Sequence, residues 1–281
     1  SQTEEWIYHN SLDGVSRVRP DGSENELVVE DVWMDDMSLD KSKLLFFGNH
    51  IITIMDIESM DTQTIGFSEY SGINPHDIRF TYDENVIIFT DSSYDLYKYS
   101  FIDSSLILIE AGGEAEGQPG ESGGNQIKHI TMSPDKQKVA FLRYHLSGDN
   151  IEVMVADIQS GEASILGTFP SLGNNCNNDI IGGGYQTYWA EDDYIYFTIC
   201  ETSTEHQLLK IHSLNGDSAQ LIENEITYAL SSVNDSYLEK LVFANFTTDS
   251  FEYWIIDLES NETSYLENMY CEIAGYPIYW L

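Results

Sequence analysis

The sequence predicts an all-β fold built from repeated sheets of four antiparallel strands. One short polar turn recurs five times, and an apolar strand follows it each time. A second turn, rich in Asp, Asn, Ser and Gly, recurs six times. A four-stranded unit that repeats every roughly 40–60 residues is typical of a β-propeller. The sequence therefore predicts six blades around a central channel.

The first recurring turn ends the innermost strand of each predicted blade. It combines a Ser, Thr or Ala with a following Asp, and apolar strands such as KLLFF, NVIIFT and KVAFL come directly after it. Asp and Ser favour tight turns because their side chains form hydrogen bonds with nearby backbone groups. The five copies are Ser38–Asp40, Thr81–Asp83, Ser133–Asp135, Ala190–Asp192 and Ser232–Asp235.

The second recurring turn joins the third and fourth strands of each blade. Its Asp, Asn, Ser and Gly residues tolerate the left-handed backbone conformations that such turns require. The six copies lie at 17–23, 55–61, 98–105, 155–161, 210–216 and 255–261. Because this turn occurs once more than the first, one blade lacks its innermost strand near the start of the chain.

The two ends of the chain are predicted to share the first blade. The chain begins on EEWIYHNS, which has the pattern of a second strand, and ends on GYPIYWL, a single aromatic strand. Placing this last strand in the first blade closes the ring and removes exposed sheet edges. We therefore expect one domain over residues 1–281, with a first blade made of residues 1–30 and 273–281.

The most regular unit spans residues 128–166. Its motif MSPDKQKVAFLRY, followed by NIEVMVADIQSGEASIL, resembles the TolB-type propeller repeat, which combines a Ser-Pro-Asp turn, an apolar strand and an Asp before a Gly turn. The opening WIYHNSLDGVSRVRPDGSENELV and the segment YWAEDDYIYF are similar to the YWTD propellers of receptor ectodomains. Both resemblances imply the fold and the binding of proteins or peptides, and neither supplies catalytic residues.

The chain carries a large excess of acidic residues. Its 48 Asp and Glu face only 12 Lys and Arg, so the formal net charge is −36. Such a field repels nucleic acid and anionic membranes, and it attracts cations and basic protein surfaces. The acids are scattered, which favours a solvated acidic surface over a dedicated cation site. No apolar run approaches the about 20 residues of a membrane helix.

Two insertions distinguish one face of the predicted propeller. Residues 111–125 (AGGEAEGQPGESGGN) and 170–184 (PSLGNNCNNDIIGGG) each follow a fourth strand and precede an innermost strand. Propeller geometry therefore places both on the face where innermost strands begin, which we call the insertion face. We expect it to be the docking surface.

Polar residues near the beginnings of innermost strands form the candidate site at the channel mouth. They are Asp36, which follows Asp35, in the second blade, His76 and Asp77 in the third, and His129 in the fourth. Two imidazoles and nearby carboxylates could bind a divalent transition metal or act as an acid–base pair. The alternative is that they are ordinary, half-exposed strand residues.

Further residues are candidates for ligand contacts. Tyr188 and Tyr276 are expected to reach the channel mouth, where their rings could stack on a ligand such as a sugar. Candidate metal ligands are His76, His129 and Asp179. The segment NNCNND at 174–179 also offers oxygen ligands for Ca²⁺, although no D-x-D-x-D-G loop is present and Asn-rich segments often form ordinary turns.

The three cysteines allow one disulfide. We expect Cys176, in the second insertion, to pair with Cys200, at the end of a second strand that leads to the same face. Cys271 is then a free thiol or a covalent link to a partner. The alternative is three unpaired thiols in a reducing compartment.

These observations favour a binding or scaffold module over an enzyme. The expected partner is a protein, peptide or glycan, of basic character because the chain is acidic. One alternative is a metal-assisted hydrolase or lyase with its site at the channel mouth, and another is a structural subunit of an extracellular assembly. The chain starts at Ser1 without an apolar leader, which fits a mature product in an extracellular or periplasmic location as well as a trimmed chain. The alternative location is the cytoplasm of a halophile.

Overall fold

The fold is described from a computed structural model of the chain. The structure describes residues 6–11, 13–18, 24–48, 51–67, 73–112, 125–145, 150–170, 187–190, 193–200, 206–226, 228–231, 240–246, 251–257, 260, 262–265 and 278–280. Within these residues every regular element is a β-strand. No helix in this part of the chain could therefore span a membrane.

The strands of the described residues form six antiparallel sheets of four strands each, numbered here along the chain. Sheet 1 contains β24 (Ile278–Trp280), β1 (Ile7–Ser11), β2 (Gly14–Val18) and β3 (Glu26–Glu30). Sheet 2 contains β4 (Trp33–Met37), β5 (Lys43–Gly48), β6 (Ile51–Asp56) and β7 (Thr62–Gly66). Sheet 3 contains β8 (Pro75–Phe80), β9 (Val86–Asp91), β10 (Leu96–Ser100) and β11 (Leu106–Glu110). Sheet 4 contains β12 (Asn125–Met132), β13 (Lys138–His145), β14 (Asn150–Asp157) and β15 (Ala163–Pro170). Sheet 5 contains β16 (Thr187–Trp189), β17 (Tyr194–Cys200), β18 (His206–His212) and β19 (Ser218–Ile226). Sheet 6 contains β20 (Tyr228–Ser231), β21 (Lys240–Phe246), β22 (Phe251–Asp257) and β23 (Thr263–Tyr265).

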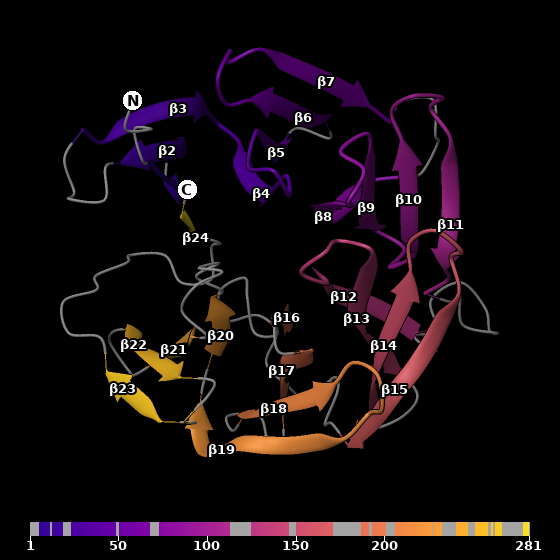
Figure 1. The fold of residues 1–281 in the computed structure, drawn as a ribbon, viewed down its shortest axis with the longest axis vertical. Helices are drawn as coiled ribbons and strands as arrows, with labels where there is room; N and C mark the ends of the chain where they lie inside the picture. The colour runs from indigo at the N-terminus through magenta and orange to yellow at the C-terminus, as the bar shows by residue number, and fades with distance from the viewer. Residues whose placement is uncertain are drawn as a thin grey trace.

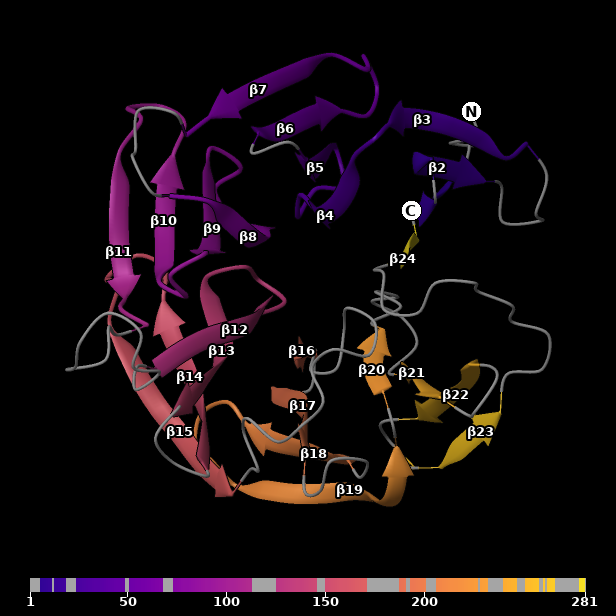
Figure 2. The same cartoon turned by 180° about the vertical axis from the view of Figure 1, so that it is seen from behind.

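The sheets are arranged around a common centre. Figure 1 shows the first strand of each sheet nearest the centre and the fourth strand at the periphery, and Figure 2 shows the same arrangement from behind. Sheet 1 combines both ends of the chain, because β24 pairs antiparallel with β1 and Ile7 lies opposite Trp280. Its strand order is therefore β24-β1-β2-β3.

The apolar core lies between neighbouring sheets, and the second strands explain why. Along β5, Leu44 and Phe46 pack towards sheet 1 and Leu45 packs towards sheet 3. Along β13, Phe141 packs towards sheet 3 and Leu142 packs towards sheet 5. Side chains alternate between the two faces of a strand. A strand covered on both faces therefore needs an unbroken apolar run, which is the pattern of KLLFF and KVAFL.

The predicted turns between first and second strands are confirmed in sheets 2, 3 and 4. The Ser38 hydroxyl oxygen accepts the backbone N–H of Lys43 at 2.9 Å. The equivalent Ser133 oxygen accepts the N–H of Lys138, also at 2.9 Å. An Asp two residues later accepts an N–H within the turn, as Asp135 does from Gln137 at 3.1 Å. Local side-chain chemistry therefore sets where each innermost strand ends.

In sheets 2 to 5 the predicted turns between third and fourth strands lie beside the first turns, and the copies at 17–23 and 255–261 lie partly outside the described residues. The N–H of Ile57, at the start of the later turn, donates to the carbonyl of Ser42 in the earlier turn of the same sheet at 2.8 Å. The equivalent pairs in sheets 3, 4 and 5 are Phe101 with Asn85, Ile158 with Gln137, and Ser213 with Asp193. Both turns of each of these sheets therefore lie on one face of the molecule, which we call the turn face.

Candidate functional site

Four candidate residues lie on innermost strands, at or beside points where the strand register is irregular: Asp36, His76, Asp77 and His129. The register of β4 shifts between Met34 and Asp36, that of β8 shifts between His76 and Arg79, and that of β12 shifts between Lys128 and Thr131. Such bulges bend a strand and re-aim its side chains. In two of the three strands the bulged residue has a positive φ, 45° at Asp77 and 57° at His129.

Two of the predicted aspartates connect neighbouring sheets. The Asp36 carboxylate, in sheet 2, accepts the backbone N–H of Phe80 in sheet 3 at 2.8 Å. The Asp77 carboxylate, in sheet 3, accepts the N–H of Ile130 in sheet 4 at 2.7 Å. Each aspartate therefore completes the hydrogen bonding of the next innermost strand.

Sheets 4 and 5 are joined at the corresponding position of their innermost strands by a hydrogen bond that involves no aspartate. The Thr187 hydroxyl, in β16, donates to the carbonyl oxygen of His129 in β12. Polar groups of one sheet thus satisfy backbone groups of the innermost strand of the next. This part of the centre is a polar seam that holds four sheets in register.

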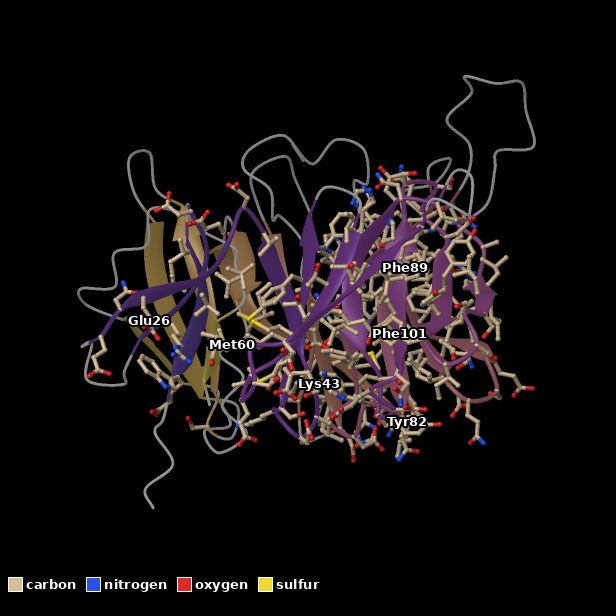
Figure 3. All side chains as sticks on the ribbon, turned by 90° about the horizontal axis from the view of Figure 1, so that it is seen from above. Glu26, Lys43, Met60, Tyr82, Phe89 and Phe101 are labelled. Carbon is tan, nitrogen blue, oxygen red and sulfur yellow. The ribbon has the colours of Figure 1, made fainter. Side chains whose placement is uncertain are left out.

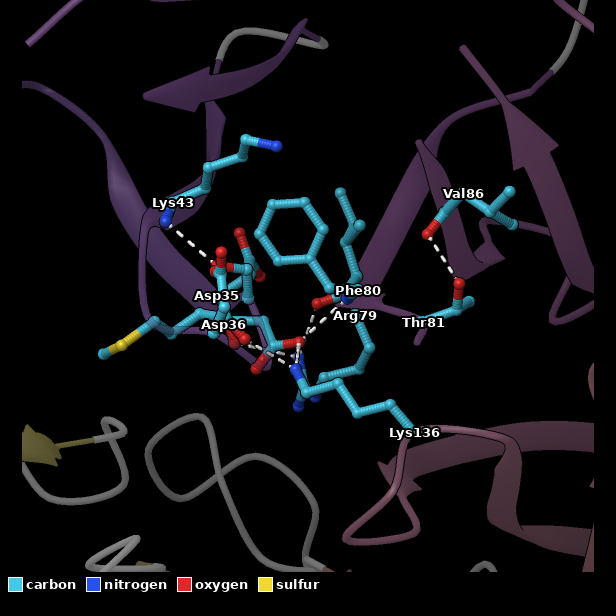
Figure 4. A network of polar contacts seen from close by, with 12 residues as sticks. Asp35, Asp36, Lys43, Arg79, Phe80, Thr81, Val86 and Lys136 are labelled. Carbon is cyan, nitrogen blue, oxygen red and sulfur yellow. Dashed lines mark hydrogen bonds and ion pairs between the residues drawn. The ribbon is translucent and has the colours of Figure 1, made fainter. Parts of the chain in front are cut away.

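Two cations complete the seam around the aspartates. Lys136, in the first turn of sheet 4, places its Nζ 2.7 Å from Asp36 Oδ2 and 2.6 Å from the carbonyl oxygen of Met37. Arg79 pairs with Asp77 at 2.6 Å and donates to the carbonyl of Asp35 at 3.1 Å. Figure 4 shows Lys136 and Arg79 converging on Asp36 and Asp35 from different sheets. Asp36 is thus reached from the turn face.

Asp35 has the most perturbed carboxyl of this seam. Burial raises its pKa, the charge of Arg79 opposes that shift, and the charges of Asp77 and Asp36 add to it, so that the pKa rises to about 7. The cause is that a charged carboxyl is costly to hold away from water. The sequence pattern placed Asp35 only as the neighbour of Asp36.

The two candidate histidines have different surroundings. His76 is exposed, with its Nε2 3.4 Å from the side-chain nitrogen of Asn74 and its ring edge-on to Phe47. His129 packs against Tyr144, with 6.2 Å between ring centroids. Burial, followed by the nearby charge of Lys128, lowers the pKa of His129 to about 3. His129 is therefore neutral at pH 7.

The structure does not describe all of the predicted ligand residues. Tyr188 is half-buried on β16, and its ring lies 6.5 Å from that of Tyr196. Tyr276, Asp179 and Cys176 lie outside the described residues, as does the side chain of Cys200 at the end of β17. Across the described ranges, no group of three or more His, Cys, Asp or Glu side chains is placed to hold a metal ion.

A lysine between two tyrosines lies at the insertion face and was not singled out by the sequence. Lys128 Nζ lies 4.9 Å from the ring centroid of Tyr94 and 5.8 Å from that of Tyr144. A cation over aromatic faces is attracted by their electron density. Burial lowers the pKa of Lys128. In the sequence, Lys128 could have been recognised as a candidate only because it is one of 12 Lys and Arg and precedes His129.

The base of the first insertion is held tightly against this group. Tyr94 lies in the turn between β9 and β10, and its carbonyl accepts the N–H of Ile127 at 3.3 Å. The N–H of Gly112 donates to Asp95 at 2.7 Å. A Cβ on Gly112 would stand 2.3 Å from the carbonyl oxygen of Tyr94, so the backbone approaches closely only because residue 112 is a glycine.

A second charged group lies beside it at the same end of sheet 4. Arg143 Nη1 pairs with Glu110 at 2.8 Å, and its Nε donates to Glu152 at 2.6 Å. His145 lies 3.0 Å from Glu152. Burial alone would raise the pKa of Glu152, but the hydrogen bonds from Arg143 and His145 lower it. The insertion face of sheets 3 and 4 thus combines aromatic rings with ordered charges.

Comparison with known proteins establishes the fold. No protein-family model matches the chain, and no curated protein matches its sequence. Three solved structures are similar over nearly the whole chain. A chain of the nidogen/laminin complex has a TM-score of 0.62 at 10% identity and covers 98% of both chains. TolB from Acinetobacter baumannii has a TM-score of 0.60 at 12% identity, covering 98% of this chain and 65% of TolB. The β-propeller domain of Swd1 from Myceliophteria thermophila has a TM-score of 0.63 at 9% identity, covering 96% and 85%.

These likenesses identify the architecture as that of a β-propeller. The resemblance to the TolB-type repeat, read from residues 128–166, is confirmed at the level of the fold. At 9–12% identity the likeness concerns the fold alone. The function must be argued from the surfaces and sites of this chain.

Proposed function

We propose that residues 1–281 form a single six-bladed propeller that acts as a binding module for a protein, peptide or glycan partner. The six sheets correspond to the six blades, and β24 closes the ring by completing blade 1 beside β1. The antiparallel pairing of Ile7–His9 with residues 278–280 supports this closure. The location we propose is extracellular or periplasmic. Nidogen/laminin and TolB propellers lend the proposal support by analogy of fold.

The observation that carries the proposal is that aspartates at the centre of the ring are already bound to other groups of the protein. Asp36 and Asp77 bond to the backbone of the next sheet and pair with Lys136 and Arg79. Groups held in this way stabilise the ring, and their replacement would disturb it. We therefore assign a structural role to the centre of blades 2 to 5 and place partner binding on the outer surface of the propeller.

The insertion face is the docking surface that we favour. Its described part has exposed His76, and the half-buried Lys128 ammonium lies there between half-buried Tyr94 and buried Tyr144. Tyrosine rings and ordered cations are enriched where proteins bind their partners, because they combine large contact areas with polar handles. The net charge of −36 favours a partner with basic regions and speeds its approach.

The test compares three forms of the protein as bait in the extracellular fraction of its source. The first is the wild type, and the second is the double variant Lys128→Gln/Tyr94→Leu. The matched control is Lys210→Gln/Tyr194→Leu, since Lys210 lies 4.7 Å from the Tyr194 ring in sheet 5. A partner held by the wild type and the control, and lost from the first variant, supports the proposal. Purified partner must then bind the wild type directly.

The proposal fails if capture is the same for all three forms while each melts as a folded protein. It also fails if the captured partner binds the unfolded chain equally well. Circular dichroism of each bait provides that check.

A further inference from the structure

The turn face is a continuous structure across neighbouring sheets. Lys43, at the end of the first turn of sheet 2, pairs with Glu84 in the equivalent turn of sheet 3. The N–H of Tyr82 in that turn donates to the carbonyl of Lys136 in the turn of sheet 4 at 3.0 Å. Figure 3 shows Tyr82 at the lower edge of the molecule, where this face lies. The three innermost turns therefore form one surface around the channel.

Apolar side chains are exposed at matching places in the inner and outer turns of this face. Leu39 and Tyr82 are the middle residues of consecutive first turns, and they are 49% and 48% exposed. Ile102 and Leu214 each follow the residue that donates to the first turn of its sheet, and they are 75% and 71% exposed. Scattered exposed apolar residues are ordinary on protein surfaces. These four residues occupy two matching turn positions, each occurring twice on one face.

Fixed negative charges lie in the outer turns of the same face as these apolar groups. The carboxylates of Asp56, Asp103 and Asp157 accept hydrogen bonds from Ser59, Ser105 and Ser160 in the outer turns, and these bonds lower the pKa of each. They stay ionised wherever the protein is folded at ordinary pH.

Three lysines of the same turns are engaged within the protein, whereas Lys41, in the first turn of sheet 2, is exposed. Lys43 pairs with Glu84, Lys136 reaches inward to Asp36, and Lys98 donates to the carbonyl of Ile158 at 2.9 Å. The positive charges of these three lysines are therefore bound to groups of the protein itself. The turn face therefore presents apolar side chains in an acidic setting.

We propose that the turn face is a second docking surface, separate from the insertion face, and that it binds a cationic amphipathic segment of a partner protein. In such a segment Leu, Phe or Met side chains would contact Leu39 and Tyr82, and Lys or Arg side chains would pair with the turn carboxylates. A second copy of this chain is the wrong occupant, because two molecules of charge −36 would bring like charges together.

The test uses a fluorescent peptide of alternating Lys-Leu pairs and measures its anisotropy with the full chain. We expect saturable binding that weakens as NaCl is added, because salt screens the charge pairs. The double variant Leu39→Ser/Tyr82→Ser should weaken binding by about tenfold, since truncated central apolar contacts commonly dominate an interface. A second double variant, Ile102→Ser/Leu214→Ser, should weaken it as well.

The matched control is Ile107→Ser/Leu108→Ser, which removes two apolar side chains of 49% and 50% exposure from outer strand β11. Its affinity for the peptide should equal that of the wild type. A poly-Lys peptide and a Glu-Leu peptide should bind at least about tenfold more weakly than the Lys-Leu peptide, because each lacks one of the two complementary features.

Four results would overturn the proposal: no binding to the wild type, unchanged affinity in both turn-face variants, an equal loss in the β11 control, or equal binding of poly-Lys. The variants leave Lys128 and Tyr94 in place. Failure at this face is therefore distinguishable from failure at the insertion face.

Discussion

Lys136 Nζ lies 2.7 Å from Asp36 Oδ2, although the two residues are 100 positions apart in the chain. Their side chains are only 12% and 8% exposed. The pair joins the first turn of sheet 4 to the innermost strand of sheet 2 and passes beside Phe80 of the sheet between them. It therefore ties three sheets together at the centre.

Replacing Lys136 by Met should destabilise the protein strongly. The substitution leaves the Asp36 carboxylate buried without its cation, and breaking a buried pair from one side costs about 3–5 kcal/mol. Urea unfolding at pH 7 gives the free energy. Lys43→Met is the control, because its pair with Glu84 is more exposed and should lose about 1 kcal/mol or less. Equal losses in the two variants would contradict a special role for the central pair.

Asp35→Asn should stabilise the protein above pH 7 and have little effect near pH 4. The folded-state pKa of Asp35 is about 7, well above its unfolded value of roughly 3.9. Between these values the folded protein binds the extra proton, so the contribution of Asp35 to stability falls as pH rises through this window. Asn carries no charge and removes that dependence.

The measurement is the difference in unfolding free energy between Asp35→Asn and the wild type from pH 4 to pH 8. It should grow by a few kcal/mol, on the order of 1.4 kcal/mol per pH unit at most. A difference that stays flat over this range would show that Asp35 is ionised throughout.

Ser133→Ala should weaken the first turn of sheet 4. The hydroxyl oxygen accepts the N–H of Lys138, and the residue is buried, so the substitution leaves a backbone donor without its acceptor. A loss of about 1–2 kcal/mol is expected from a chemical denaturation curve. Ser160→Ala is the control: its hydroxyl lies in an exposed turn, and the loss should be about 0.5 kcal/mol or less. If the two variants lose the same amount, the recurring Ser does not define the turn.

Gly112→Ala should destabilise the protein because the new methyl group would collide with the carbonyl oxygen of Tyr94. Forced overpacking against backbone costs about 1–3 kcal/mol. Gly66→Ala is the matched control, since a Cβ there would meet nothing within 4 Å. It should be neutral or stabilise the protein by up to about 1 kcal/mol. Thermal melts of both variants decide the matter, and a stable Gly112→Ala protein would refute the close approach.

The sequence predicted the elements well, because their causes are local. A Ser or Thr and an Asp close a turn through hydrogen bonds to backbone groups a few residues away, as at Ser38 and Ser133. An apolar run such as residues 138–142 identifies a strand covered on both faces. Both signals lie within a few neighbouring residues, and in sheets 2, 3 and 4 the turns and strands stand where they predict. The predicted turns at 190–192 and 232–235 lie partly or wholly outside the described residues.

The sequence predicted the candidate site less well. His76 and His129 occupy related innermost strands, but one is exposed and the other is neutral and packed against Tyr144. Their environments depend on how each bulge aims its side chain and on which ring of another strand stands opposite. The Lys128 group was missed because Tyr94 reaches it from the preceding sheet.

The sequence by itself determined the all-β class, the order of the strands and the chemistry of the turns, since each follows from interactions between near neighbours. Only the tertiary structure decided that Asp36 and Asp77 form hydrogen bonds with the next sheet and that Lys136 is the partner of Asp36. It also decided that the pKa of Asp35 is raised. Those outcomes depend on the packing of one sheet against another, which sets distances and solvent exposure between residues far apart in the chain. A pattern read along one strand carries no information about them.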